Sequence, residues 1–204
     1  MITIEDVRSA LAALGFRKRA GDIYTLELED PDVIGVIGFN RASRSLPAGV
    51  FRINPIVGVR HEPIERTVAE LQRTKFHQYT PSTVNTPIGY VMPDNRYMTW
   101  TFGVEVESDS GLSLVDAVEQ YAIAFFAASQ DLRSLCALLE EGVGYDHQIV
   151  YRHPIARMLL GDSERADELV QNELSRIQGH QYEAAVNFRA FADEYRQWRI
   201  TDGR

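Results

Sequence analysis

The chain has 204 residues with a formal net charge of −8, and 45% of its residues are hydrophobic. These values exclude a disordered polymer and are typical of a globular protein with a core of its own. The acidic balance and the absence of a long apolar run argue against nucleic acid and against a membrane as partners.

A short amphipathic helix is predicted over residues 4–14. Thr3 followed by Asp6 resembles a capping box, in which each residue satisfies a backbone N–H of the other. Gly15 is typical of the residue that ends a helix.

Three strands are predicted next. Residues 23–29 alternate between apolar and polar side chains, which indicates a strand with one face in water. Residues 33–39 are apolar on both faces and indicate an interior strand. Residues 50–59 form the third strand, and Pro55 is interpreted as a bulge or a sheet edge because proline cannot donate a ladder hydrogen bond.

A helix that opens with Pro63 in its first turn follows the third strand. Residues 77–87 are rich in Thr, Pro, Ser and Asn and are predicted to form an irregular candidate binding loop. A hairpin is then predicted between residues 88–92 and 97–107, and a shift by one residue would expose the whole apolar side of its second strand. That apolar side consists of Met98, Trp100, Phe102, Val104 and Val106.

The pattern changes after Gly111, where no further strand is predicted. Residues 112–128 are apolar nearly all round, which indicates a buried helix. Further helices are predicted over residues 131–141, 151–160, 164–177 and 182–198. In the last of them, one core-facing stripe is expected to contain Ala184, Phe188, Phe191, Tyr195 and Trp198.

These patterns predict an α+β fold, with an antiparallel sheet of about five strands flanked by helices and an all-helical C-terminal half. The expected division places a sheet region over residues 1–110 and a helical region packed on it over residues 111–204, with one single domain as the alternative. Residues 1–110 contain 14 acidic and 12 basic residues, whereas residues 111–204 contain 15 and nine. A basic partner would therefore be recruited by the helical half.

The cysteine content and the N-terminal sequence indicate a cytoplasmic protein. Cys136, the single cysteine, lies in an apolar run, where a free thiol packs as a small hydrophobic group. No intrachain disulfide can form, and the first residues lack the basic and apolar segments of a signal peptide. The predominance of arginine over lysine suggests a genome rich in G and C.

The first 75 to 110 residues contain a series of short motifs. They are Leu14-Gly15-Phe16-Arg17-Lys18-Arg19, Ile23-Tyr24, residues 33–39, Gly49-Val50-Phe51-Arg52-Ile53-Asn54, and Gly58-Val59. As a set these motifs resemble a widespread bacterial domain of unknown function. The resemblance implies a helix that ends in a Gly-Phe-basic-basic turn and continues into a sheet, and it implies no activity. Small acidic cytosolic proteins of this general appearance are often immunity proteins or antitoxins, which is an argument by analogy.

No motif for catalysis, phosphate binding or metal binding occurs in the sequence, so no catalytic residue, cofactor or metal is expected. Gly35 and Gly38 lie inside a predicted strand and are interpreted as points of close backbone packing. The solvent side of the last predicted strand, the candidate loop and one nearby histidine supply the possible partner or ligand contacts. These are His61, His77, Tyr79, Thr99, Thr101, Glu105 and Glu107.

The leading hypothesis is a non-enzymatic cytosolic binding protein, most concretely a bacterial immunity protein or antitoxin that occludes a partner toxin, with a basic toxin as one form of that partner. The alternative is a small-molecule hydrolase or transferase with a site between the sheet and the helical half. It would require two or more titratable groups to converge in a deep polar pocket, and the first candidates are His61, His77, Glu105 and Glu107. A homodimer formed through a sheet edge or the last helix is a third possibility.

Overall fold

The computed structural model describes residues 3–79, 81–103 and 110–201. Two compact units are present: the first contains Met1–Arg60 and Asn85–Gln130, and the second contains His61–Val84 and Asp131–Arg204. Each unit thus combines two separate parts of the sequence. The predicted α+β fold is confirmed, whereas the predicted division near residue 110 stays a prediction.

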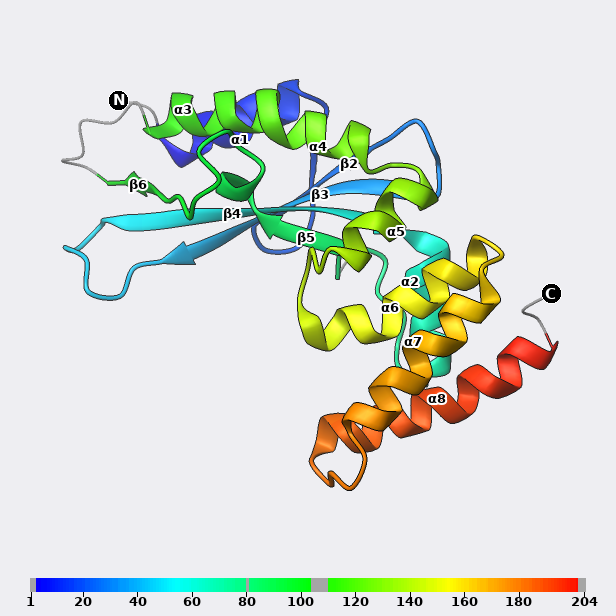
Figure 1. Cartoon of the computed structure of the whole chain (residues 1–204). Helices are drawn as coiled ribbons and strands as arrows, with labels where there is room; N and C mark the ends of the chain where they lie inside the picture. Colours follow the sequence, from blue (N-terminus) through cyan, green and yellow to red (C-terminus); the bar gives the residue numbers. More distant parts are fainter. Residues whose placement is uncertain (1–2, 80, 104–109, 202–204) are drawn as a thin grey trace. The chain divides into compact units, whose positions relative to one another are not determined.

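The strands form one six-stranded antiparallel sheet (Figure 1). Its order is β1-β2-β3-β4-β5, and β6 also pairs with β4. β3 is an interior strand, as its apolar sequence predicts. The strands are β1 (Arg17–Lys18), β2 (Ile23–Glu27), β3 (Val33–Ala42), β4 (Phe51–His61), β5 (Val84–Pro87) and β6 (Trp100–Phe102).

The hairpin predicted after the candidate loop is wrong. Residues Ile88–Tyr90 form a short 3-10 turn, η1, and β6 pairs with β4 instead, with Phe102 opposite Phe51 and Trp100 opposite Ile53. The predicted faces are confirmed for Trp100 and Phe102, which are both buried. Alternation specifies which face of a strand is buried, but it does not specify the neighbouring strand.

Two expectations in this region stay predictions. β4 as a whole is bonded to β3, β5 and β6 and is not an edge strand. Its pairing with β6 ends at Ile53, two residues before Pro55, so the interpretation of Pro55 as a bulge or a sheet edge stays a prediction. The expected apolar positions Val104 and Val106 lie outside the described residues.

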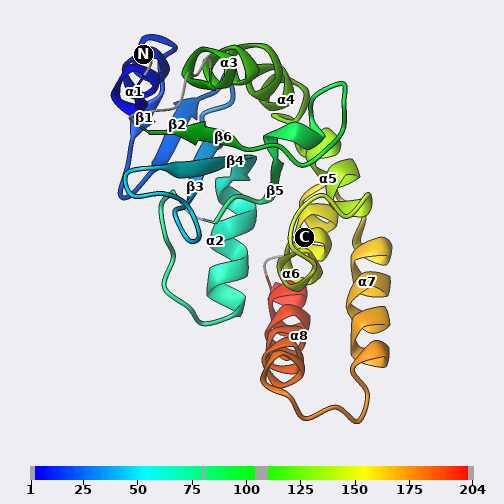
Figure 2. The same ribbon diagram turned by 90° about the vertical axis from the view of Figure 1, so that its left-hand side faces the viewer.

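Three helices of the first unit cover one face of the sheet, as Figures 1 and 2 both show. The predicted capping box of the first helix is confirmed, because the Thr3 hydroxyl accepts from the Asp6 N–H and the Asp6 carboxylate accepts from the Thr3 N–H. A wide π-helical turn interrupts the apolar helix that is predicted as continuous over residues 112–128. The segments are α1 (Ile4–Ala13), α3 (Ser110–Ala117), the π turn η2 (Val118–Ala122) and α4 (Ile123–Ala128).

A glycine allows α4 to approach the sheet closely. A Cβ atom at Gly35 would lie 2.8 Å from the ring of Phe126, whereas a Cβ atom at Gly38 would have no atom within 4 Å. The interpretation as close packing is therefore confirmed for Gly35 and wrong for Gly38. Phe126 also packs edge-on against Phe16, at 6.3 Å between ring centroids.

The second unit is helical. α6 begins five residues before the predicted start at Tyr151, because its first turn is polar and shows no apolar periodicity, and Pro154 lies inside the helix. In the last helix Ala184 is exposed, which corrects the predicted stripe, and Ala185 is buried with Phe188. The helices are α2 (Glu62–Leu71), α5 (Leu132–Glu140), α6 (Asp146–Leu159), α7 (Ser163–Arg176) and α8 (Glu183–Thr201).

No single helix among the described residues is long and apolar enough to cross a bilayer. Ser113–Ala128 and Leu132–Glu140 reach the required length and hydropathy only when the two segments are taken together.

Candidate functional site

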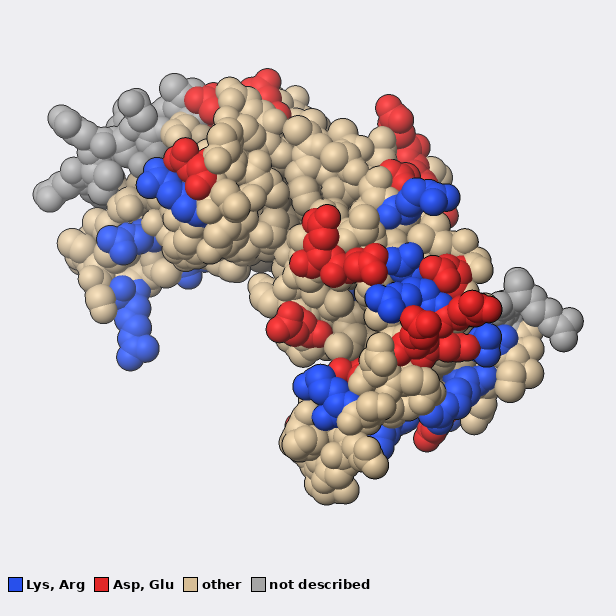
Figure 3. Space-filling view, in the orientation of Figure 1, with Lys and Arg blue, Asp and Glu red and all other residues tan. Residues whose placement is uncertain are grey.

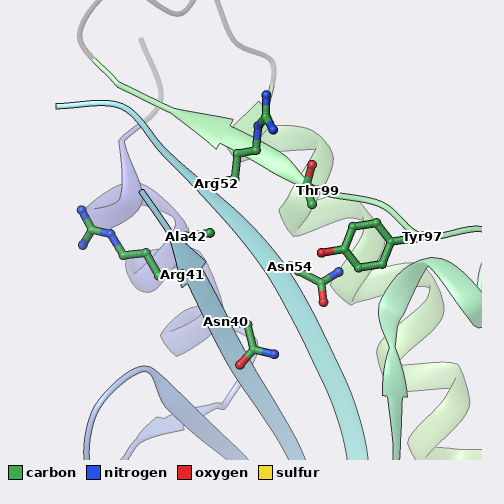
Figure 4. A pocket seen from close by; sticks show the side chains of 7 residues that line it. All are labelled: Asn40, Arg41, Ala42, Arg52, Asn54, Tyr97 and Thr99. Atoms are coloured by element: carbon green, nitrogen blue, oxygen red, sulfur yellow. The ribbon is translucent and has the colours of Figure 1, made fainter. Parts of the chain in front are cut away.

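A shallow groove of about 340 Å³ lies on the sheet of the first unit, where the end of β3 and the start of β4 meet the segment before β6 (Figure 4). Its residues come from three stretches of the chain that the sheet brings together. The lining consists of Asn40, Arg41, Ala42, Arg52, Asn54, Tyr97 and Thr99.

Strand alternation determines which face holds the groove. Gly35 faces Phe126 of α4, so Arg41, six residues further along β3, stands on the same helix-covered face. Asn40 and Ala42 therefore stand on the opposite face, which is the face of the groove. Arg41 borders the groove from the helix-covered side.

Pairing between β4 and β6 positions the other half of the groove. Arg52 lies opposite Thr101, and both alternate with the buried pairs formed by Phe51 and Ile53. Asn54 donates a hydrogen bond of 2.8 Å from Nδ2 to the carbonyl oxygen of Met98. This bond ties the irregular segment before β6 to β4.

The side chains of the groove differ in how firmly they are held. Asn54 is only 8% exposed, whereas Tyr97 is 60% exposed and extends over the groove toward Asn54. The guanidinium carbon of Arg41 lies 3.6 Å from the centroid of the Phe51 ring, a cation–π contact that holds it in place. In Figure 4 the side chains of Arg41 and Arg52 extend in different directions.

The candidate contacts predicted from the sequence fall in both units. Thr99 lines the groove, and Thr101 lies beside Arg52. Glu105 and Glu107 lie outside the described residues, so a pair of carboxylates on this strand stays a prediction.

The remaining candidates belong to the second unit. His61 is buried at the N-terminus of α2, where its Nδ1 accepts from the Ile64 N–H at 3.4 Å and its own N–H donates to the Thr83 hydroxyl at 2.9 Å. His61 thus has a structural role as a helix cap. His77 is exposed and Tyr79 is half-buried in the segment between α2 and β5.

No sequence motif marks Asn40, Arg52, Asn54 or Tyr97 as site residues. One signal for them is present in the sequence, because residues 33–61 contain no Asp or Glu although the chain as a whole is acidic. An uncharged or basic stretch of this length indicates a locally cationic surface.

Titratable groups of the second unit show shifted pKa values. Burial, together with the charge of Arg157, lowers the pKa of His153 to about 4, and the Arg157 Nε–H donates to His153 Nε2 at 3.3 Å. Burial raises the pKa of the Cys136 thiol, as expected for a packed cysteine. Among the residues that the structure describes, no cluster of three or more His, Cys, Asp or Glu side chains could hold a metal ion.

The second unit has two further grooves, of about 430 and 470 Å³, which share Tyr151 of α6. Each has a paired arginine at its rim, Arg73 with Glu194 in one and Arg176 with Glu173 in the other. The groove on the sheet differs because its lining contains arginine and no carboxylate.

Comparison of the chain with protein-family models, with curated proteins and with solved structures gives no match. The resemblance to a bacterial domain of unknown function therefore stays a prediction. A functional proposal rests on the geometry of the described residues.

Proposed function

We propose that this chain is a non-enzymatic binding protein that contacts a partner protein through the sheet groove of its first unit. Its most concrete form is a cytosolic bacterial immunity protein or antitoxin that occludes a partner toxin. The groove is the support for the binding function. The immunity role goes further and rests on the analogy with small acidic cytosolic proteins.

The chemistry of the groove lining is the observation that carries the proposal. Arg41, Arg52 and Tyr97 line the groove, and the described lining residues include no Asp, Glu, His, Cys or Lys that could act as a general acid or base. The three side chains can donate hydrogen bonds to a partner. Tyrosine and arginine are also the residues that contribute most to protein–protein interfaces.

The first test compares two exposed tyrosines of the same unit. The tagged chain is used to capture partners from native lysate, and the dissociation constant of each stoichiometric partner is then measured by calorimetry. Tyr97→Ala is expected to weaken binding by about tenfold or more, because an exposed aromatic at a groove is a typical interface anchor. Tyr90→Ala, at a tyrosine that is 47% exposed outside the groove, serves as the control.

Two outcomes would contradict the proposal. One is the absence of any stoichiometric partner, and the other is an equal loss of affinity in Tyr97→Ala and Tyr90→Ala. The immunity role is tested separately by expressing the genes adjacent to this one with and without the chain. Toxicity that the chain does not relieve would remove the immunity role and leave the binding function to the first test.

A further inference from the structure

The end of the β3–β4 hairpin has a charge opposite to that of the whole chain. The chain has a net charge of −8, yet Arg41, Arg44 and Arg52 are all exposed on this hairpin, and residues 33–61 contain no carboxylate. Figure 3 shows Lys and Arg atoms and no Asp or Glu atoms at the end of this hairpin. We call Arg41, Arg44 and Arg52 together the arginine hairpin.

The three arginines of the arginine hairpin have no carboxylate partner among the described residues. Elsewhere in the first unit arginines are paired, as Arg8 is with Asp22 and Arg17 is with Glu27. Unpaired guanidinium groups retain their full capacity for charge-assisted hydrogen bonds to an added carboxylate.

The geometry selects an extended ligand over a small anion. Arg41 is held against Phe51, whereas Arg52 is directed by its place opposite Thr101 in the ladder. Because the two side chains extend in different directions, one small anion cannot contact both (Figure 4). A chain that carries several carboxylates can contact each of them in turn.

We infer that the arginine hairpin and the adjacent groove bind an acidic segment of a partner protein. This inference rests on the proposed function and adds the sign of the charge that the partner presents. It differs from the expectation of a basic partner recruited by the helical half, since it concerns another surface and the opposite charge. Three arginines suit a short acidic peptide better than nucleic acid, where six to ten phosphate contacts are usual.

The test uses the full chain and a fluorescein-labelled peptide of ten residues that alternates Glu and Gly, with binding followed by fluorescence anisotropy at low salt. Arg52→Gln and Arg44→Gln are each expected to raise the dissociation constant by about three- to tenfold, because each removes a charge-assisted contact. Higher salt should weaken binding through screening. A peptide that alternates Lys and Gly should not bind.

Arg17→Gln is the matched control, because Arg17 is an exposed arginine of the same sheet that is already paired with Glu27 at 2.7 Å. The affinity of the Arg17→Gln variant for the acidic peptide should equal that of the unchanged chain. Thermal unfolding of every variant checks that the fold is intact, and Arg52→Lys should restore part of the affinity because it restores the charge.

Several results would overturn the inference. One is that the acidic peptide does not bind, and another is that Arg52→Gln binds it as tightly as the unchanged chain does. A third is that the chain binds single-stranded oligouridine more tightly than it binds the acidic peptide. A fourth is that millimolar inorganic phosphate displaces the peptide. A natural partner that is lost in Tyr97→Ala but retained in Arg52→Gln would overturn the inference and leave the proposed function intact.

Discussion

Arg152 of α6 forms a two-point ion pair with Glu65 of α2 inside the second unit. The Nε–Oε1 distance is 2.7 Å and the Nη2–Oε2 distance is 3.1 Å. The two side chains are only 3% and 5% exposed. Because both charges have lost most of their hydration, each depends on the other.

Removal of one partner of this pair should be far more costly than removal of both. Arg152→Met removes the two-point contact to the Glu65 carboxylate while that carboxylate stays buried, and we expect it to lower the free energy of unfolding by about 3–5 kcal/mol. The double variant Glu65→Leu/Arg152→Met should lose less than the sum of the two single variants. Urea unfolding of the three variants measures this coupling.

Arg196→Met is the control for the ion pair. Arg196 pairs with Asp193 on the surface of α8, with both side chains at least half exposed, so its loss should change stability by less than about 1 kcal/mol. If Arg152→Met and Arg196→Met lower the free energy of unfolding by similar amounts, the buried pair contributes no more to stability than the exposed pair does.

The buried His153 should make stability depend on pH. Its pKa falls from 6.5 to about 4 in the folded chain, since burial and the charges of Arg157 and Arg165 disfavour the imidazolium, while Glu140 acts in the opposite direction. The unfolded chain therefore binds a proton near pH 6.5 that the folded chain does not bind until about pH 4. The stabilisation is complete above pH 6.5 and is lost as the pH falls toward 4, by at most about 3 kcal/mol.

Denaturant unfolding between pH 4 and 7 measures this dependence. His153→Gln should flatten the slope over that range by up to about 1.4 kcal/mol per pH unit, the value for one proton. His147→Gln, at an exposed histidine of the same helix, should leave the slope unchanged. If the slope in His153→Gln equals that of the unchanged chain, other groups cause the dependence of stability on pH.

Two glycines of β3 should respond differently to the same substitution. Gly35→Ala places a methyl group 2.8 Å from the Phe126 ring, which we expect to destabilise the chain by about 1–3 kcal/mol. Gly38→Ala meets no atom within 4 Å and should be neutral or slightly stabilising, because alanine restricts the unfolded chain. Thermal unfolding compares the two.

The ring of Phe126 is the source of the expected difference between these glycines. In a Phe126→Leu background, Gly35→Ala should therefore lose much of its effect, and a double-mutant cycle measures that coupling. A full effect of Gly35→Ala in that background would point to the backbone rather than to the ring.

Arg73 occupies a backbone conformation that suits glycine. It follows α2 with a φ angle of 53°, and the Thr74 N–H donates to the Ala69 carbonyl oxygen, as in a Schellman motif. Its ion pair with Glu194 is exposed and contributes little. Arg73→Gly should therefore be about 1 kcal/mol more stable than Arg73→Ala. Equal stability of the two variants in urea unfolding would show that a non-glycine residue is not strained at this position.

The sequence predicts local features of this fold better than its pairings. The capping box at Thr3 and Asp6 and the buried face of Trp100 and Phe102 depend on residues close together in the chain, and both are confirmed. The partner of the β6 strand was predicted wrongly because β4 lies about 50 residues earlier, and alternation contains no information about such a neighbour.

The candidate site was predictable only in part for the same reason. The polar side of a predicted strand indicates Thr99 and Thr101 as candidate contacts. Arg52 and Asn54 stand beside them only because β4 pairs with β6, and Asn40 joins them from β3. The absence of acidic residues between positions 33 and 61 indicates the charge of this surface but not its location in the sheet.

The wide turn η2 keeps one row of side chains aligned along the helical segment that covers the sheet. Leu114, Val118, Ala122 and Phe126 are all fully buried, at a constant spacing of four residues. In a regular α-helix this spacing advances by about 40° beyond a full turn at each step, so the row would wind away from the sheet. A turn with more residues than usual reduces that winding. Deletion of one residue from η2 would consequently rotate α4 about its own axis. Phe126 would then no longer lie above Gly35, and the space over this glycine, which has no side chain, would stay unfilled.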